Sequence, residues 1–391
     1  MAATKAATKA APGRGTREHT SLLDVDALLA NPDVGIIVCC GSGGVGKTTT
    51  AAALGLRAAE AGRKVVVLTI DPARRLAQSL GLTALDNTPR PVAEVDPTKG
   101  GSLDAMMLDM KRTFDDVVEA HAVPDKAAQI LANPFYQAVS SSFAGTQEYM
   151  AMEKLGQLRA EATDRGTWDL IVVDTPPSRS ALDFLDGRFI RLLAAPAKAG
   201  GRAYLKVFTA GVSLAASTLS KILGGQMLTD VQTFVAALDT MFGGFRERAD
   251  VTYALLKEPA TAFVVVAAPE RDALREAAYF VDRLASERMP LAGVVVNRLQ
   301  ALAAPTLTAS RAEAGAEFLD EAETHATQCP ATLELLRLHA DLATLADRHR
   351  AQVSRFAAGH PGIPLVEVPA SATDIHDLAG LRAIGAALGG R

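Results

Sequence analysis

Cysteine is scarce in this chain of 391 residues, which contains only three: Cys39, Cys40 and Cys329. Two are adjacent and no C-x-x-C pair occurs, so the spacing excludes a disulfide framework and a two-cysteine metal clip. Cys39 and Cys40 fall within an apolar run. We therefore expect them to be small, buried residues of a strand.

A strong charge of one sign is also lacking, since the formal net charge is -4 and the isoelectric point is about 6.0. This balance argues against a surface built to neutralise nucleic-acid phosphates, so no nucleic-acid partner is expected. Long apolar runs are lacking too. The uncharged stretch 127–147 carries glutamines, an asparagine, a proline and serines, which exclude a membrane-spanning helix.

Residues 1–20 hold scattered basic residues among alanine, threonine and glycine, without an apolar stretch. They predict a disordered tail instead of a signal peptide, and hence a cytoplasmic protein. The remaining composition, 49 % hydrophobic and 21 % charged, is ordinary for a globular protein.

Continuous apolar runs typical of strands buried on both faces of a sheet recur along the chain, at 35–40, 64–70, 103–108, 168–173, 262–268, 291–296 and 363–368. Helical stretches separate them, which predicts an α/β fold with a doubly wound, mostly parallel sheet. Two of the gaps, of about sixty and about ninety residues, exceed a simple crossover helix. We therefore expect a core of 21–109, 166–190 and 259–391, with a helical subdomain of 110–165 and 191–258 inserted.

The first strand runs into a glycine-rich turn that precedes an alanine-rich helix. The turn fits the pattern G-x-x-x-x-G-K-[ST], in which backbone N–H groups surround the phosphates of a nucleotide. Lys47 is expected to act on the outer phosphates as a catalytic residue, and the Thr48 hydroxyl to bind Mg²⁺. The predicted nucleotide-binding residues are Gly41, Gly43, Gly44, Val45, Gly46, Lys47, Thr48 and Thr49.

Two aspartates follow buried strands, where ligands bind in sheets of this kind. We assign Asp174 to the Mg²⁺ site, through its second shell, and to sensing the γ-phosphate. We assign Asp71 to orienting the attacking water. The alternative for each aspartate is a helix N-cap.

Asn297 ends a further strand, where its amide can donate to and accept from a base edge. A guanine-selecting N-K-x-D site needs an acid at position 300, and the chain has Gln300 there. Adenine, and hence ATP, is therefore expected. The turn at Pro369 is rigid and is predicted to close over the same ring.

These residues resemble the arsenite-pump and tail-anchored-protein-targeting ATPase family, whose P-loop is a deviant Walker A sequence. The similarity runs over nearly the whole chain from 34 on. It matches the family's P-loop, switch I, helical G-x-x-E element, switch II and adenine contact, at Gly41–Thr49, Asp71-Pro-Ala, Gly145-Thr-Gln-Glu148, Asp174-Thr-Pro-Pro and Asn297. The stretch 174–186 is similar to the bacterial, particularly actinobacterial, branch. The resemblance implies ATP-hydrolysing dimers whose helical subdomains open and close.

Two departures from the family stand out. Where the family usually has a lysine that reaches the partner's nucleotide, the chain has Ser42. Arg74 or Arg75 beside switch I can replace that charge, or a paralogous subunit with the lysine can supply it, so homo- and hetero-oligomers both stay open. The metal-binding cysteines of the family have no counterpart, so metalloid export is not expected.

The leading hypothesis is a cytoplasmic Mg²⁺-dependent ATPase that couples closure to handling a hydrophobic client, such as a membrane-protein segment, in the helical subdomain. One alternative is the energising subunit of an anion efflux system. Another is a ParA- or MinD-like positioning switch, and a third is a nucleotide-binding scaffold with little turnover. The apolar C-terminal segment 375–388 is predicted to pack on the sheet.

Overall fold

The computed structural model describes residues 21–70, 75–133, 136–137, 146–176, 247–321 and 330–390. Their strands form an 8-stranded sheet in the order β3-β4-β2-β5-β1-β6-β7-β8. The strands are β1 (Ile36–Gly41), β2 (Lys64–Thr69), β3 (Arg90–Pro91), β4 (Ser102–Met107), β5 (Leu170–Asp174), β6 (Thr261–Ala267), β7 (Leu291–Leu299) and β8 (Leu365–Pro369).

All neighbouring strands are parallel except β3, which pairs antiparallel with β4. The predicted α/β class with a mostly parallel sheet is therefore confirmed. The apolar runs identified all seven parallel strands but missed β3. A two-residue edge strand that contains a proline has no apolar run by which to recognise it.

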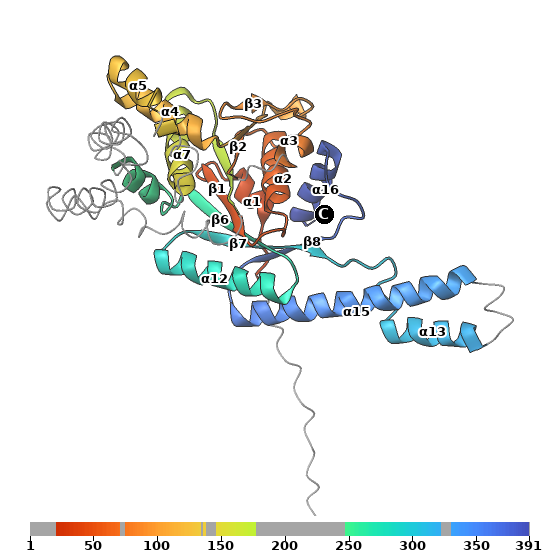
Figure 1. Ribbon diagram of the computed structural model, residues 1–391. Helices are drawn as coiled ribbons and strands as arrows, with labels where there is room; N and C mark the ends of the chain where they lie inside the picture. Colours follow the sequence, from red (N-terminus) through yellow and green to blue (C-terminus); the bar gives the residue numbers. More distant parts are fainter. Residues whose placement is uncertain are drawn as a thin grey trace, which may run out of the picture.

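One face of the sheet is covered by α2 (Lys47–Glu60), α3 (Arg75–Ser79) and α16 (Leu378–Leu388), and α1 (Val25–Ala30) joins the same apolar core (Figure 1). Alanine and glycine let α2 lie close to the strands, since a Cβ at Gly55 would be 2.6 Å from Val67 Cγ2. The C-terminal helix α16 lies beside α2 and next to β8. Helix α16 was predicted to pack on the sheet, and it does so at β8, but it packs mainly against α2.

The other face is covered by α7 (Thr146–Arg165), α12 (Arg271–Glu287) and the C-terminal part of α15 (Pro330–Gly359). Helix α4 (Met110–His121) lies next to α7, and α5 (Pro124–Leu131) lies next to α4. Met106, Met150 and Met152 are buried in this core, as expected for methionines that fill space. The sheet thus has helices on both faces, which is the doubly wound arrangement.

The predicted helical subdomain is described only in part. Its segment 110–165 contains α4, α5 and α7, whereas most of 191–258 lies outside the described residues. The tail 1–20 lies outside them as well. The division into core and inserted subdomain therefore stays a prediction.

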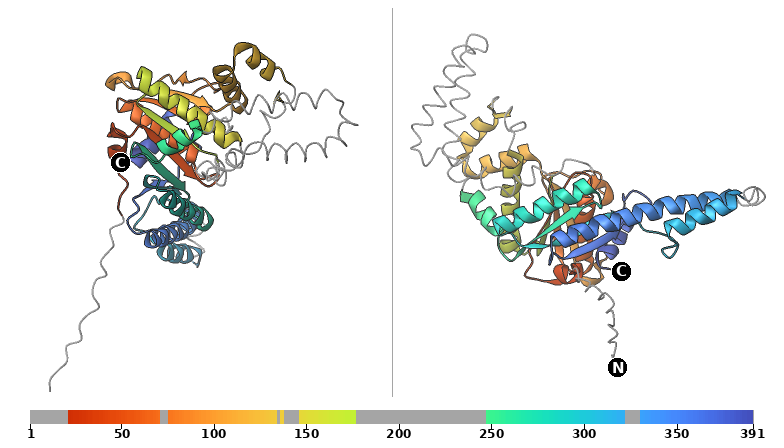
Figure 2. Two further views of the ribbon diagram at one scale, coloured as in Figure 1. Left: turned by 90° about the vertical axis from the view of Figure 1, so that its left-hand side faces the viewer. Right: turned by 90° about the horizontal axis from the view of Figure 1, so that it is seen from below.

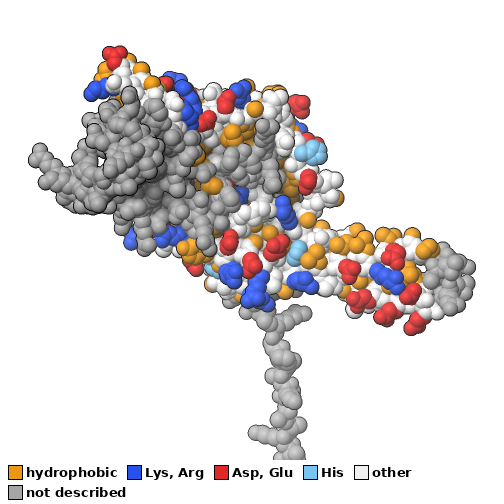
Figure 3. All heavy atoms as spheres, in the orientation of Figure 1, with side chains coloured by type: hydrophobic (Ala, Val, Ile, Leu, Met, Phe, Trp, Pro, Cys, Tyr) orange, Lys and Arg blue, Asp and Glu red, His pale blue; other side chains and the backbone are white. Residues whose placement is uncertain are grey.

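Helix α13 (Ala309–Glu321) runs beside the N-terminal half of α15, and this helical pair projects beyond the sheet (Figures 1 and 2). Buried alanines allow the close approach: Ala312 and Ala316 from α13, Ala340 and Ala343 from α15. Phe318, Leu335 and Leu338 are exposed on this pair, where apolar and acidic side chains gather (Figure 3).

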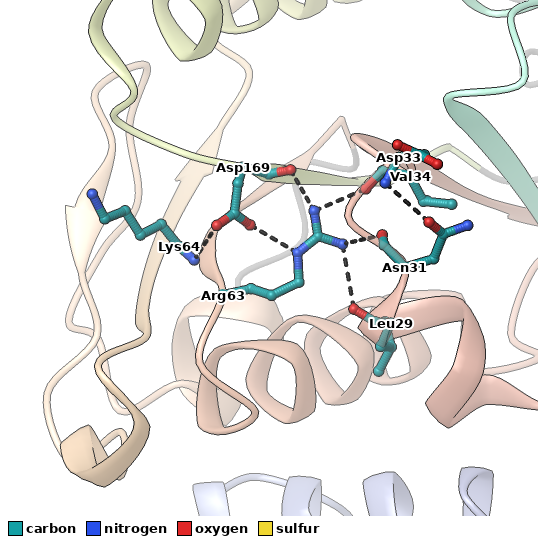
Figure 4. A network of polar contacts seen from close by, with 7 residues as sticks. All are labelled: Leu29, Asn31, Asp33, Val34, Arg63, Lys64 and Asp169. Atoms are coloured by element: carbon teal, nitrogen blue, oxygen red, sulfur yellow. Dashed lines mark hydrogen bonds and ion pairs between the residues drawn. The ribbon is translucent and has the colours of Figure 1, made fainter.

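Arg63 joins three turns at the edge of the sheet where the parallel strands begin (Figure 4). Its guanidinium donates to Asp169 Oδ1 at 2.8 Å and to the backbone oxygens of Leu29, Asn31, Val34 and Asp169 at 2.6–3.3 Å. The starts of β1, β2 and β5 are thereby held together at the end of the sheet opposite the glycine-rich turn.

None of the described helices combines the length and the apolar character that crossing a membrane requires.

Candidate functional site

The glycine-rich turn between β1 and α2 has a backbone that only glycine adopts without strain at two positions. Gly44 and Gly46 have φ angles of 77° and 97°, in the left-handed region. A Cβ at Gly46 would be 2.2 Å from Asn297 Nδ2, and one at Gly41 would be 2.1 Å from the Val266 carbonyl oxygen. The turn is therefore packed tightly against residues of β6 and β7.

Gly46 is also the N-cap of α2, and no side chain caps this helix end. The first N–H groups of a helix lack partners within it, and the helix dipole is positive there, so the turn is suited to bind anions. The Lys47 ammonium donates to the Ser42 carbonyl at 2.8 Å, and the residue is 7 % exposed. Lys47 thus folds back across the turn and brings a positive charge to the same place.

Asp174, at the end of β5, accepts two hydroxyl hydrogen bonds on one oxygen. Thr48 Oγ1 donates to Asp174 Oδ2 at 2.7 Å, and Thr69 Oγ1 donates to the same atom at 2.9 Å. Asp174 is paired in register with Cys39 of β1 and Thr69 of β2, so parallel strands bring these groups to one edge of the sheet. A carboxylate with two hydroxyls is an oxygen-only set of the kind that Mg²⁺ prefers.

Asn297, predicted to contact the base, lies against the glycine-rich turn. Its amide nitrogen donates to the Val45 carbonyl at 2.9 Å, and the residue is 7 % exposed. The sequence showed no sign of this contact, because the two residues are 252 positions apart. Only the strand order, which puts β6 between β1 and β7, brings them into reach.

Pro369 ends β8 and is exposed beside the end of β7, where it is paired in register with Leu299. The Ala370 N–H donates to the Leu299 carbonyl at 2.7 Å, which holds the turn next to the strand of Asn297. Gly43 belongs to the glycine-rich turn, and Thr49 belongs to the N-terminal turn of helix α2. Asp71, Arg74, Gly145 and the side chains of Arg75 and Glu148 lie outside the described residues.

Cys39 and Cys40 are buried in β1, as predicted. Burial raises the pKa of the Cys39 thiol well above its usual value, and the nearby Asp174 carboxylate raises it further. Burial also raises the pKa of Cys40 to about 12, although Lys47 opposes the shift. Both thiols are therefore protonated near neutral pH, which makes them poor nucleophiles and poor metal ligands.

Taken together, the parallel sheet, the anion-binding turn and the carboxylate beside Thr48 define a P-loop nucleotide hydrolase of the α/β class. The sequence profile described as "Anion-transporting ATPase" matches residues 34–332. The chain belongs to the anion-transporting ATPase family, and it is an ATPase. The resemblance to the arsenite-pump and targeting ATPases is thereby confirmed.

Individual relatives agree with this assignment. The chain is 26 % identical to "ATPase ASNA1 homolog 2" of Paramecium tetraurelia, over 70 % of this chain and 78 % of that protein. It is 30 % identical to "Arsenical pump-driving ATPase" of Acidiphilium multivorum, over 40 % of this chain and 24 % of that protein. It is 27 % identical to "ATPase BagA" of Mycobacterium tuberculosis, over 37 % of this chain and 43 % of that protein. The last is an actinobacterial protein, in line with the predicted branch.

Proposed function

We propose that ATP hydrolysis by this chain depends on Mg²⁺ and drives the closure of paired subunits, which handle a hydrophobic client such as a membrane-protein segment. The observation that supports the Mg²⁺ requirement is the convergence of Thr48 and Thr69 on Asp174 beside the phosphate-binding turn. Operation in the cytoplasm is part of the same proposal.

Each residue of the turn has a task in this proposal. The backbone N–H groups of Gly41 to Thr49 surround the phosphates, and Lys47 places its ammonium on the outer ones. Thr48 would bind Mg²⁺ as a ligand, and Asp174 would hold the ion through its second shell. Bound there, Mg²⁺ would supply positive charge to neutralise the phosphates. Asp71 orients the attacking water.

Adenine recognition is assigned to the edge of β7 and β8. An asparagine amide offers both a donor and an acceptor to a base edge, and Asn297 stands next to the turn that holds the phosphates. Pro369 lies on the neighbouring strand, in register with Leu299. We therefore expect ATP to displace a labelled ATP analogue better than GTP does.

Substitution of the acids tests the catalytic assignment. Asp71→Asn and Asp174→Asn should each lower turnover by about 10²-fold, because a positioned carboxylate acts mainly in the transition state. Only Asp174→Asn should change the Mg²⁺ concentration needed for half-maximal rate, whereas Lys47→Ala should weaken ATP binding itself. Asp341→Asn, at an exposed acid on α15, serves as the matched control. Full turnover of both acid variants would refute the assignment.

Client handling is tested with a labelled leucine-rich peptide of about 20 residues, long enough to span a membrane. The proposal expects the full-length protein to retain this peptide in solution, with an affinity that changes between ATP and ADP. A peptide of equal length with alternating serines should not be retained. Turnover stimulated by an oxyanion, together with no peptide retention, would support the anion-efflux alternative instead.

A further inference from the structure

The buried side-chain amide of Asn297, on β7, is hydrogen-bonded to the phosphate-binding turn. Asn297 Nδ2 donates to the Val45 carbonyl at 2.9 Å, and the same nitrogen occupies the space where a Cβ of residue 46 would stand, at 2.2 Å. The contact therefore holds the Val45 carbonyl half of the peptide link to Gly46, and the same nitrogen lies against the Gly46 Cα. It also explains why position 46 has no room for a side chain.

The backbone of β7 departs from the extended conformation immediately after Asn297. Arg298 has a φ of 64°, in the left-handed region that side chains other than glycine rarely adopt. The register between β7 and β8 also shifts between Val296 and Leu299. The strand alternation is thus interrupted at the residue that contacts the turn.

We propose that Asn297 is a positioning residue for phosphate binding, in addition to its expected contact with the base. A trans peptide is planar, with its C=O and N–H on opposite sides. Holding the Val45 carbonyl toward Asn297 therefore aims the Gly46 N–H away from β7, into the turn. This inference rests on the proposed function, in which that turn holds nucleotide phosphates.

Loss of the amide would free this peptide link to rotate. Gly46 accepts a wide range of backbone angles, so no side chain opposes a flip that turns the Val45 carbonyl toward the phosphates. A carbonyl oxygen there would repel the anion that the N–H group attracts. An asparagine amide has two N–H groups and an acceptor oxygen, so one donor can hold the turn while the others serve a base.

Tripolyphosphate separates the two roles because it has phosphates but no base. Isothermal titration of the full-length protein should show roughly tenfold weaker tripolyphosphate binding for Asn297→Ala, the usual effect of losing one buried hydrogen bond. The control Thr261→Val removes a buried hydroxyl bond to the Leu255 carbonyl, far from the turn, and should bind like the wild type. Weaker ATP binding with unchanged tripolyphosphate binding would overturn the proposal in favour of a base contact alone.

A pH profile provides a second measurement. An ionised carboxylate cannot donate to the Val45 carbonyl, but a protonated carboxyl can, and burial raises the pKa of such a group. Relative to the wild type at the same pH, Asn297→Asp should bind tripolyphosphate poorly at pH 8 and recover toward pH 5. Asn297→Ala should not recover. Should the alanine variant fail to fold, the aspartate profile decides alone, and a flat profile overturns the proposal.

Binding by the wild type distinguishes a failure of this inference from a failure of the proposed function on which it rests. A wild-type chain that binds neither ATP nor tripolyphosphate would refute the proposed function, and with it the role of Asn297. A wild-type chain that binds both, beside an Asn297→Ala variant that does the same, would refute only the positioning role.

Discussion

Gly46 is subject to three constraints at once: a left-handed backbone, the N-cap of α2 and the contact with Asn297. Gly44 has a left-handed backbone as well, but a Cβ there would meet nothing within 4 Å. Substitution of Gly44 therefore tests backbone strain alone, whereas substitution of Gly46 tests strain together with a steric clash.

Gly46→Ala is predicted to weaken ATP binding by about 100-fold or more, because strain of about 1–2 kcal/mol adds to a collision with a buried amide. Gly44→Ala should cost only the backbone strain of about 1–2 kcal/mol, which is about 5- to 30-fold. Titration with ATP of both purified variants checks this. Equal losses of ATP affinity in the two variants would show that the Asn297 side chain moves to make room for the methyl group.

At the scale of secondary-structure elements, the turns that enter β1, β2 and β5 depend on the Arg63 side chain, which is 11 % exposed. Its planar fork serves four backbone oxygens and one carboxylate, a geometry that a lysine ammonium cannot reproduce. Loss of this fork would leave several of those acceptors without a donor.

Arg63→Lys is predicted to lower the free energy of unfolding by about 1–3 kcal/mol, since the two partly buried acceptors, the carbonyls of Leu29 and Val34, each cost about 1 kcal/mol or more when left without a partner. Urea unfolding measures the difference. The control Arg350→Lys, in an exposed ion pair with Asp347, should change little. ATP affinity of the folded Arg63→Lys variant should match the wild type, because Arg63 lies at the opposite end of the sheet.

A second contact at this scale joins α15 to the end of β7. The Gln300 N–H donates to His349 Nδ1 at 3.2 Å, so the imidazole accepts this bond in its neutral form. Burial lowers the pKa of His349, and Arg348 lowers it further, while Glu270 opposes the shift. Neutral His349 is therefore favoured in the folded protein.

The sign of the pH effect follows from this shift. Because the folded pKa lies below the unfolded value of about 6.5, the unfolded chain binds the proton more readily, and stability falls as the pH drops below that value. His349→Gln keeps an acceptor but has no proton to bind. Unfolding measured from pH 8 to pH 5 should show a shallower loss for the variant, and parallel curves would contradict the prediction.

For the whole molecule, the decisive feature is Ser42, which stands where the family usually has the lysine that reaches a partner subunit's nucleotide. Ser42 is 8 % exposed, and its hydroxyl has no hydrogen-bond partner among the described residues. It carries no charge with which to reach a neighbour's phosphates. A cation of the arginine-finger kind contributes orders of magnitude to the rate, so a homodimer needs a replacement.

The isolated chain is therefore predicted to hydrolyse ATP slowly and to be stimulated markedly by a paralogous subunit that carries the P-loop lysine. Steady-state turnover of each subunit and of the mixture measures this, with a lysine-to-alanine variant of the paralogue as control. Arg74→Ala and Arg75→Ala test the internal replacement. Brisk turnover by the chain alone that survives both substitutions would rule out both explanations.

The sequence by itself determined the features that depend on local chemistry. Glycine spacing, the lysine and the threonine specify the glycine-rich turn, because backbone angles and N–H directions are set within a few residues. Buried apolar runs specified the parallel strands. Asp174 was placed at the site because the carboxyl ends of parallel strands meet at one edge.

Only the tertiary structure decided the contacts between distant parts of the chain. The pairing of Asn297 with Val45 and of Thr69 with Asp174 depends on strand order and register, which no local pattern encodes. The same holds for β3 and for the helical pair of α13 and α15, whose arrangement follows from packing. These contacts are long-range hydrogen bonds and buried surfaces, so they exist only after the chain has folded.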